Sequence, residues 1–263
     1  MTRGEGGRGT RDGWLAYALG LPLAVLALAP FLYMVVSAVR DQPIETFVAA
    51  ATTMPFDRFL LTSLVLSLAV ASGQVFTSAT AAYALARLRF AGRERVLLVY
   101  LSALMAPGIL LAIPRFLLID ALGWVDRYRG LVSTELVSVT GIFLLRQFFR
   151  TIPRELEDAA RLEGAREWTI FWRVILPVSR PALVTLGVLA FADQWRSFLW
   201  PLVATRAESM RPVEVGIADL RGLYELSGPG QMAAATLAVL PVVLVYCVAR
   251  RYFVSGISET GLR

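Results

Sequence analysis

The chain has 263 residues, a hydrophobic content of 57% and a mean hydropathy of +0.62, which together indicate an integral membrane protein. It has no histidine, and all 26 basic residues are arginine, so imidazole catalysis, histidine metal sites, a lysine-dependent P-loop and Schiff-base chemistry are excluded. The net charge of +6 comes from arginines beside apolar runs, which favours membrane topology over nucleic-acid binding.

Six apolar runs follow one another and are expected to form six transmembrane helices of an all-α protein. They cover residues 13–39, 59–86, 96–114, 130–145, 181–205 and 226–249. Residues 1–12 are rich in glycine and arginine and are expected to be a disordered cytoplasmic tail. We expect 13–58 to hold the first transmembrane helix and an external connector, 59–250 a core of five helices, and 251–263 a cytoplasmic C-terminal tail.

Three of these runs predict local detail. Pro107 and Gly108 lie near the middle of the third run and predict a kink. The fourth run would be only about 24 Å long as a helix, so we expect it to extend past Arg146, whose side chain can reach the headgroups. The only cysteine, Cys247, lies in the sixth run and is expected to be a small buried side chain.

Arginines are distributed unevenly between the two sides that six spans would create. The two ends of the chain, the connector 87–95 and the connector 146–180 together hold 17 arginines, whereas the other connectors hold nine. Because short cytoplasmic loops are enriched in basic residues, both termini and the segment 151–183 are expected to lie in the cytoplasm.

The segment 151–183 is the longest arginine-rich polar interruption of the chain, and it has helical order. Pro153 suits a first helical turn, and the acids after it favour the positive end of a helix dipole. Gly164 is expected to end this helix in a left-handed conformation. A second amphipathic helix should then lie against a membrane with one apolar face. That face contains Trp168, Phe171, Trp172 and Ile175.

A cytoplasmic loop between the fourth and fifth spans with this pattern of residues resembles the EAA loop of ABC importer permeases. The family reads Glu-Ala-Ala, a glycine four residues after the last alanine, and a later Ile-Leu-Pro. The matching stretches here are Asp158-Ala159-Ala160, Gly164 and Ile175-Leu176-Pro177. Asp158 stands for the usual glutamate and Glu163 for the usual aspartate, and both changes keep the charge.

Other stretches look similar to the carbohydrate-uptake branch, which includes the smaller maltose permease subunit. They are residues 81–87, 141–149, 198–202 and 251–256. The branch usually has Trp-Asn-Asp where this chain has Trp195-Arg196-Ser197, and the first connector of this chain is short for the branch. Both departures face the side where cargo arrives, so they weaken any inference about the substrate.

The resemblance implies a type I ABC importer permease fold, with 151–183 as a cytoplasmic coupling helix, in a bacterial or archaeal cell membrane. The implied function is import of a sugar or oligosaccharide by alternating access. The implied partners are a second permease subunit, a dimer of ATP-binding subunits, an extracytoplasmic solute-binding protein and the lipid bilayer, and not nucleic acid. The chain would hold no cofactor or metal, since the ATPase would bind ATP and Mg; the missing lysine independently requires ATP hydrolysis by another chain.

The residues expected to couple the chain to the ATPase share the EAA-like loop. They are Glu157, Asp158, Ala159, Ala160, Glu163, Gly164, Ile175 and Pro177. Asp158 and Glu163 would meet basic or polar groups of the ATPase, and the alanines would allow close approach. No catalytic residue is expected in the chain.

Asp193 and Arg196 interrupt the fifth run at a spacing that allows them to pair on a helix. They would either line or gate the transport path, or mark a helix end at the outer surface. Trp195 and Trp200 are interpreted as anchors at the membrane interface, with stacking against a sugar as the alternative.

Two alternative functions remain open from the residues. One is an ABC importer permease for glycerol phosphate or another polar solute. The other is an ion-coupled secondary transporter, which would need intramembrane ionisable relays and paired broken helices. A membrane-embedded enzyme would need a catalytic constellation that the sequence does not offer.

Overall fold

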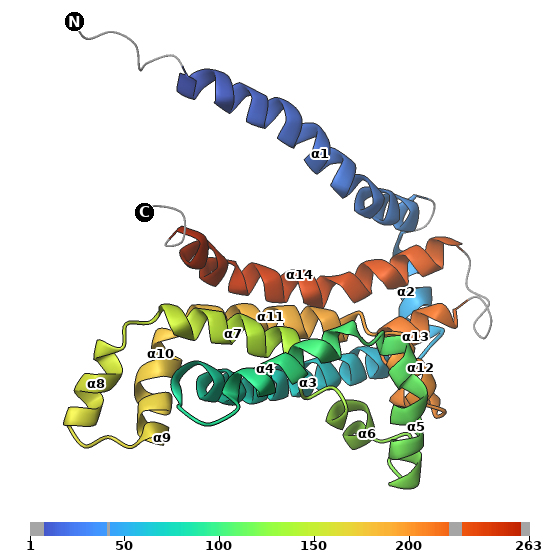
Figure 1. The fold of residues 1–263 in the computed structure, drawn as a ribbon. Coiled ribbons are helices and arrows are strands. Elements are labelled where there is room, and N and C mark those ends of the chain that lie inside the picture. The colour runs from blue at the N-terminus through green and yellow to red at the C-terminus, as the bar shows by residue number, and fades with distance from the viewer. Residues whose placement is uncertain (1–7, 41–42, 221–227, 259–263) are drawn as a thin grey trace, which may run out of the picture. The chain divides into compact units, whose positions relative to one another are not determined.

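The computed structural model describes residues 8–40, 43–220 and 228–258, and within these ranges it contains helices and no strand (Figure 1). The helices are α1 (Arg8–Val39), α2 (Pro43–Thr52), α3 (Phe56–Arg87), α4 (Arg93–Ser102), η1 (Ala103–Met105), η2 (Gly108–Leu111), α5 (Ala112–Ala121), α6 (Tyr128–Ser133), α7 (Val139–Thr151), α8 (Glu155–Leu162), α9 (Glu167–Ile170), η3 (Phe171–Ile175), α10 (Leu176–Val178), α11 (Arg180–Trp195), α12 (Leu199–Ala204), η4 (Glu208–Met210), α13 (Val213–Ala218) and α14 (Gly228–Ser258). The predicted tails 1–12 and 251–263 lie partly outside the described residues, and their described parts, 8–12 and 251–258, continue the terminal helices.

The chain forms two compact units. The first comprises residues 1–54 and 220–237, and in it α1 packs against α2. The second comprises residues 55–219 and 238–263 and contains the candidate site.

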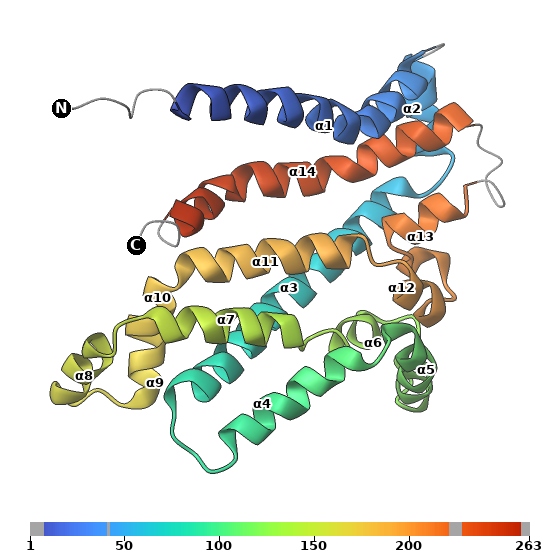
Figure 2. The ribbon, with the colours of Figure 1, turned by 45° about the horizontal axis from the view of Figure 1, so that its top comes forward.

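Helix α3 is the centre of the second unit, where it packs against α7 and α11 (Figure 2). Small side chains make this close packing possible, because they let helix backbones approach each other within the low-polarity interior. Gly141 of α7 is one such position: a Cβ there would lie 2.6 Å from Ser78 Oγ, so only glycine fits. At the end nearest α8, the core is completed by the buried aromatic rings of Phe149 and Phe171.

Three helical stretches of the described chain are long and apolar enough to cross a membrane: Gly20–Val39, Phe56–Arg87 and Gly228–Arg250. Two bent helix pairs also qualify as broken spans, which gives up to five. One pair, Arg93–Met105 with Gly108–Ala121, bends by 95° at the Pro107-Gly108 break and thereby confirms the predicted kink. The count of six spans stays a prediction.

The fourth predicted span is wrong as one continuous helix. Residues 134–138 are not helical, and Ser138 begins α7 by accepting a hydrogen bond from the Gly141 backbone N–H at 3.0 Å. A serine at this position competes for backbone hydrogen bonds and starts a new helix instead of continuing the old one. Helix α7 does extend past Arg146, as predicted, and ends at Thr151. The expected reach of the Arg146 side chain to the headgroups is wrong, since this side chain is 7% exposed and pairs with Glu94.

The expected burial of Cys247 is also wrong, since its side chain is exposed on α14. Leu244 and Val248, at neighbouring positions, are each 65% exposed. In lipid an outward-facing apolar side chain is in its preferred solvent, so an apolar run does not reveal which of its residues face inward.

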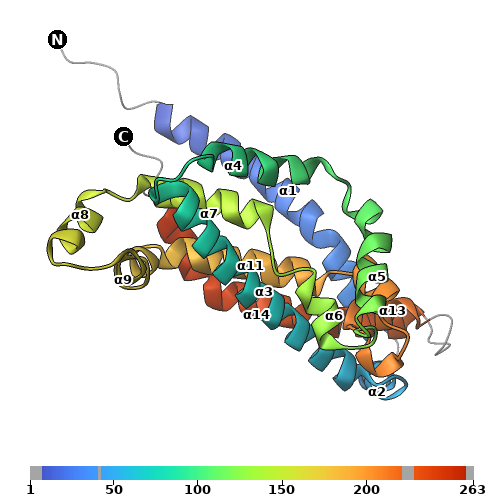
Figure 3. The same ribbon diagram turned by 60° about the horizontal axis from the view of Figure 1, so that its bottom comes forward.

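The second unit has two distinct ends. Figures 2 and 3 place α8, α9 and α10 at one end and α5, α6, α12 and α13 at the other. Residues 151–183 lie at the first end, and the charged residues that interrupt the fifth run, Asp193 and Arg196, lie toward the second. The two candidate sites are therefore separated by the length of α11.

Candidate functional site

Helix α8 ends in the turn that the sequence predicts. Gly164 has φ of +83°, a left-handed conformation that favours glycine. The backbone N–H of Ala165 donates to Ala160 O and that of Gly164 to Arg161 O, each at 3.0 Å. These two bonds form a Schellman motif, which satisfies carbonyls that the helix end would otherwise leave unpaired. The predicted role of Gly164 as the helix-ending residue is confirmed.

The second helix of the segment runs through α9, η3 and α10 and contains a stretch of wider, π-helical turn at Phe171–Ile175. It bends by 78° at Ser179 before α11 begins. Its predicted apolar face is divided in the structure: Phe171 and Ile175 are buried, whereas Trp168 is 61% and Trp172 46% exposed. Ile170 is buried as well, so the buried face of the helix is turned toward Ile170, and the two tryptophans lie at its margin.

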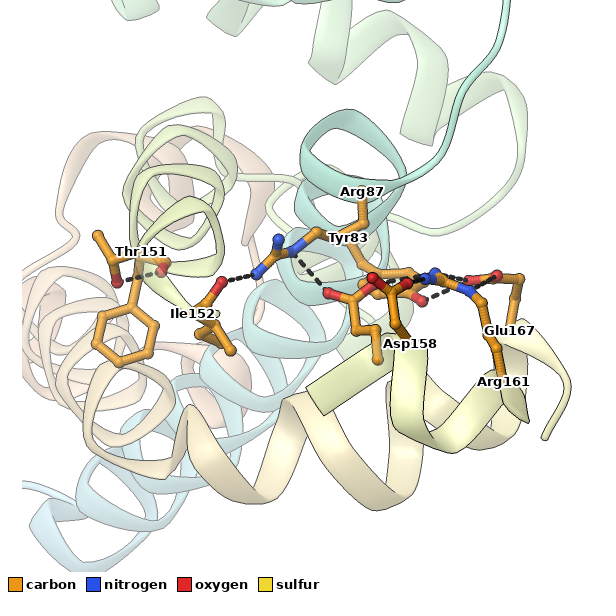
Figure 4. Close-up of polar contacts among 9 residues, drawn as sticks. Tyr83, Arg87, Thr151, Ile152, Asp158, Arg161 and Glu167 are labelled. Carbon is orange, nitrogen blue, oxygen red and sulfur yellow. Dashed lines mark hydrogen bonds and ion pairs between the residues drawn. The ribbon is translucent and has the colours of Figure 1, made fainter. Parts of the chain in front are cut away.

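A buried ion pair fastens α8 to the end of α3 (Figure 4). Arg87 Nε lies 2.9 Å from Glu157 Oε1, and both side chains are only 3% exposed. The N–H does not point along this line, so the contact is an ion pair and not an aligned hydrogen bond. Arg87 Nη2 also donates to the Ile152 carbonyl at 2.5 Å. A single arginine thus joins α3, the end of α7 and α8.

A second arginine, Arg161, joins the two helices of the segment. Its guanidinium donates to Asp158 at 2.8 Å, to Glu167 at 2.9 Å and to Glu157 at 3.0 Å. The hydrogen bond with Glu167, above all, raises the pKa of Arg161. Tyr83 of α3 completes the network by donating its hydroxyl to Glu167 Oε2 at 2.8 Å (Figure 4).

The eight residues predicted to couple the chain to an ATPase fall on two faces. Glu157 and Ile175 are buried, and Ala160 is partly buried against the core cluster around Phe149. The exposed ones are Asp158, Ala159, Glu163, Gly164 and Pro177. The outward face of α8 also carries Leu162, which is 91% exposed. Glu157 therefore belongs to the attachment of α8 and not to its free surface.

At the opposite end of the second unit, a hollow of about 470 Å³ brings charged residues together. Its lining includes Arg115, Glu135, Asp193, Gln194, Arg196 and Trp200. Asp193 and Arg196 pair at 3.6 Å, as their spacing predicts, and both are exposed at the end of α11. Arg115 pairs with Glu135 and lies 4.1 Å over the ring of Trp200.

The two tryptophans interpreted as interface anchors are buried instead. Trp195 is 3% and Trp200 5% exposed. Their indole N–H groups donate to Ala238 O at 3.1 Å and to Leu131 O at 3.3 Å. A buried indole needs such a partner, so these side chains hold neighbouring segments together.

The family description "Binding-protein-dependent transport system inner membrane component" matches residues 74–259, which include both α8 and the hollow. The chain belongs to this family. Two relatives are the arabinooligosaccharides transport system permease protein AraQ of Bacillus subtilis, 31% identical, and the sn-glycerol-3-phosphate transport system permease protein UgpE of Agrobacterium fabrum, 35% identical. Each alignment covers 78% of this chain and 73% of the relative.

Solved structures agree on the fold. A chain in the crystal structure of a bacterial ABC transporter involved in the import of the acidic polysaccharide alginate superposes with a TM-score of 0.82 at 21% identity. The match covers 96% of this chain and 100% of that one. A second structure, of a bacterial alginate ABC transporter in complex with an alginate pentasaccharide-bound periplasmic protein, gives a TM-score of 0.67 at 17% identity. The fold is that of a type I ABC importer permease.

Membership in the family confirms several predictions made from the residues. The chain is a membrane-embedded permease subunit of an ABC importer, and the ATPase is a separate subunit. Transport by the family depends on a binding protein. The ion-coupled secondary transporter is therefore no longer an alternative.

Sequence reasoning missed the residues that attach α8 to the rest of this permease. These residues do not belong to the EAA-like pattern and come from three separate helices: Tyr83 and Arg87 from α3, Arg161 from α8 and Glu167 from α9. One signal was available: Arg87 ends a long apolar run, where a buried charge requires a partner. The sequence alone does not say that Glu157 is that partner.

Proposed function

We propose that this permease carries a saccharide across the membrane and receives the energy for it through the outward face of α8. That face combines an exposed apolar strip with negative charge: Leu156 is 44% and Leu162 91% exposed, and Ala159 lies between them. Asp158 and Glu163 flank the strip. A narrow apolar ridge with acidic margins suits insertion into a groove of an ATPase subunit with basic or polar edges. The observation that carries this proposal is the exposure of Leu162 on the face of α8 that turns away from the buried Glu157.

The attachment of α8 would make the segment a lever. Arg87 and Arg161 tie α8 to α3, to the end of α7 and to α9, so a displacement of α8 would be passed to these helices instead of being lost in a flexible loop. Closure of the ATPase dimer on ATP would move the docked segment, and the helices would change between inward-facing and outward-facing states. The bend at Ser179 follows the π-helical turn, and we expect α11 to change its angle there when α8 is displaced.

The proposed complex has the composition that such importers require. A second permease subunit would complete the path, an ATPase dimer would bind ATP and Mg, and an extracytoplasmic solute-binding protein would deliver the cargo. The arginine distribution supports a multi-pass chain with both termini in the cytoplasm, where α8 would meet the ATPase.

A sugar or oligosaccharide is the proposed cargo. AraQ transports arabinooligosaccharides by its name, and the structural relatives come from an alginate importer. The hollow with Asp193 and Arg196 offers both donors and acceptors of hydrogen bonds, which suits a polyhydroxylated solute. The glycerol phosphate relative supports a second candidate, a small polar solute. Uptake of labelled oligosaccharide and of labelled glycerol phosphate by proteoliposomes that hold the complete transporter distinguishes the two.

A single backbone change tests the docking proposal. Gly164→Pro is incompatible with a φ of +83°, so it should disrupt the turn after α8 while membrane insertion continues. We expect the permease pair to lose its ATPase in a pull-down. Gly123→Pro is a matched control, because Gly123 ends α5 with φ of +64° and the same pair of hydrogen bonds at the other end of the unit. Normal ATPase association of Gly164→Pro would contradict docking through this segment.

A further inference from the structure

A second charged hollow lies beside the root of α8, at the ends of α3, α4 and α7. It has a volume of about 540 Å³ and is lined by Arg87, Arg93, Glu94, Arg146, Arg150 and Arg154. An adjoining hollow of about 760 Å³ adds Arg89, Phe90 and Arg95 from the turn between α3 and α4. We call the two together the arginine hollow.

The arginine hollow contains more positive charge than its own carboxylates can balance. Glu94 pairs with Arg93 at 3.2 Å and with Arg146 at 3.3 Å, and Glu157 pairs with Arg87. No described carboxylate lies within ion-pair distance of the remaining members. These are Arg89, Arg95, Arg150 and Arg154, and all four are exposed. Four unpaired guanidinium groups around one concavity favour an anion with several oxygen acceptors.

The surface next to these arginines is apolar. On α4, Leu98 is 64% and Val99 70% exposed, while Leu97 between α3 and α7 is buried. Phe90, at the rim of the hollow, is 44% exposed. An arginine cluster continuous with an exposed apolar helix face matches a molecule that has an anionic head and a hydrocarbon chain.

We propose that the arginine hollow binds the phosphate group of an anionic phospholipid from the cytoplasmic leaflet, with an acyl chain lying along α4. Basic pockets between helices on the cytoplasmic side are suited to such headgroups, and the arginines lie on the side that their own distribution assigns to the cytoplasm. The bound lipid would neutralise the cluster and hold together the ends of α3, α4 and α7, from which α8 projects. The lipid site goes beyond the proposed function and depends neither on the cargo nor on docking to the ATPase.

Lipid binding is measured on the whole transporter. The complex, extracted in mild detergent and depleted of lipid, is titrated with phosphatidylglycerol or phosphatidylcholine, and bound lipids are counted by native mass spectrometry. We expect phosphatidylglycerol to bind at least tenfold more tightly. Each arginine near an anionic lipid contributes roughly fivefold in affinity, so Arg150→Gln with Arg154→Gln should weaken phosphatidylglycerol binding about 25-fold.

Two further pairs of variants separate the site from general electrostatics. Arg173→Gln with Arg180→Gln removes the same charge from exposed positions outside the hollow and should change binding less than twofold. Arg89→Gln with Arg95→Gln should repeat the 25-fold loss from a different element, which guards against a folding defect in the first pair. Equal losses from all three pairs would overturn the proposal.

Two other results would also overturn it. Displacement of the lipid by an equal concentration of inorganic phosphate would show that a free anion suffices and that the apolar face contributes nothing. Lipid binding that occurs only after the ATPase subunits are removed would show that the arginines serve the ATPase. Retention of phosphatidylglycerol by the intact complex, with the stated effects of the variants, supports the lipid site.

Discussion

Removing the charge of Glu157 should detach α8 from the rest of the permease. The side chains of Arg87 and Glu157 are each 3% exposed, so Glu157→Gln leaves a buried guanidinium without its carboxylate. Breaking a buried ion pair by removing one partner costs about 3–5 kcal/mol, because the remaining charge is uncompensated. The same change also removes the ion pair that Arg161 makes with Glu157 at 3.0 Å. At about 3 kcal/mol, the population with α8 detached would rise roughly 150-fold.

Two assays report this detachment in the complete transporter. Trypsin should cut after Arg161 or Arg166 roughly 150-fold faster when proteolysis follows the equilibrium population of the open form. ATP-driven uptake into proteoliposomes should fall, because a detached α8 cannot pass its displacement to α3. Glu155→Gln is the matched control: it makes the same chemical change on the same helix at an exposed residue and should cost only a few tenths of a kcal/mol through the helix dipole.

A double variant tests whether the Arg87–Glu157 pair only attaches α8 or whether its charge is also required. Arg87→Met with Glu157→Met leaves no buried charge and should recover much of the lost stability, since apolar replacement of a buried pair is often neutral. The reasoning is refuted if Glu157→Gln and Glu155→Gln show the same proteolysis rate and the same uptake.

Three further predictions concern single contacts. Leu162→Asp should change the free energy of unfolding by no more than about 0.5 kcal/mol, because the side chain is 91% exposed. The same variant should lose its association with the ATPase in a pull-down. Retained association would contradict docking through the outward face of α8. Tyr83→Phe removes the hydrogen bond to Glu167 and should lower the free energy of unfolding by about 1 kcal/mol, whereas Tyr100→Phe should not, and equal effects would argue against the network. Gly141→Ala should cost about 1–3 kcal/mol, because a Cβ would lie 2.6 Å from Ser78 Oγ, and Gly108→Ala, which faces open space, serves as the control in the same melting experiment.

Local chemistry in the sequence predicts much of this permease's structure. Gly164 ends α8 because glycine readily adopts the left-handed conformation that closes a helix. Pro107-Gly108 breaks the third run because proline has no N–H with which to continue the helical hydrogen bonds. Both signals act within a few residues. The spacing of Asp193 and Arg196 predicts their pairing for the same reason.

Features that depend on packing between distant parts of the chain could not be predicted. An apolar run in a membrane protein is favourable in lipid and in the core alike, so Cys247 could not be assigned to either from its place in such a run. The partner of Arg87 lies 70 positions along the chain, beyond any local pattern. Glu157 and Asp158 are neighbours in the sequence, yet Glu157 attaches α8 and Asp158 faces outward. The difference arises because α3 covers only one side of α8, and the sequence does not say which.

Cross-linking to the ATPase tests most directly the proposal that the outward face of α8 contacts the ATPase. With Cys247 replaced by serine the permease has no cysteine, so a single new one can be introduced at Leu162 or at Ala160. Leu162 is exposed on the outward face, while Ala160 lies against the core cluster. In the assembled transporter, Leu162→Cys should form a cross-link with an ATPase subunit in high yield and Ala160→Cys should form almost none. Equal yields from both positions, or cross-linking from Ala160→Cys alone, would contradict the assignment of the outward face of α8 to the ATPase.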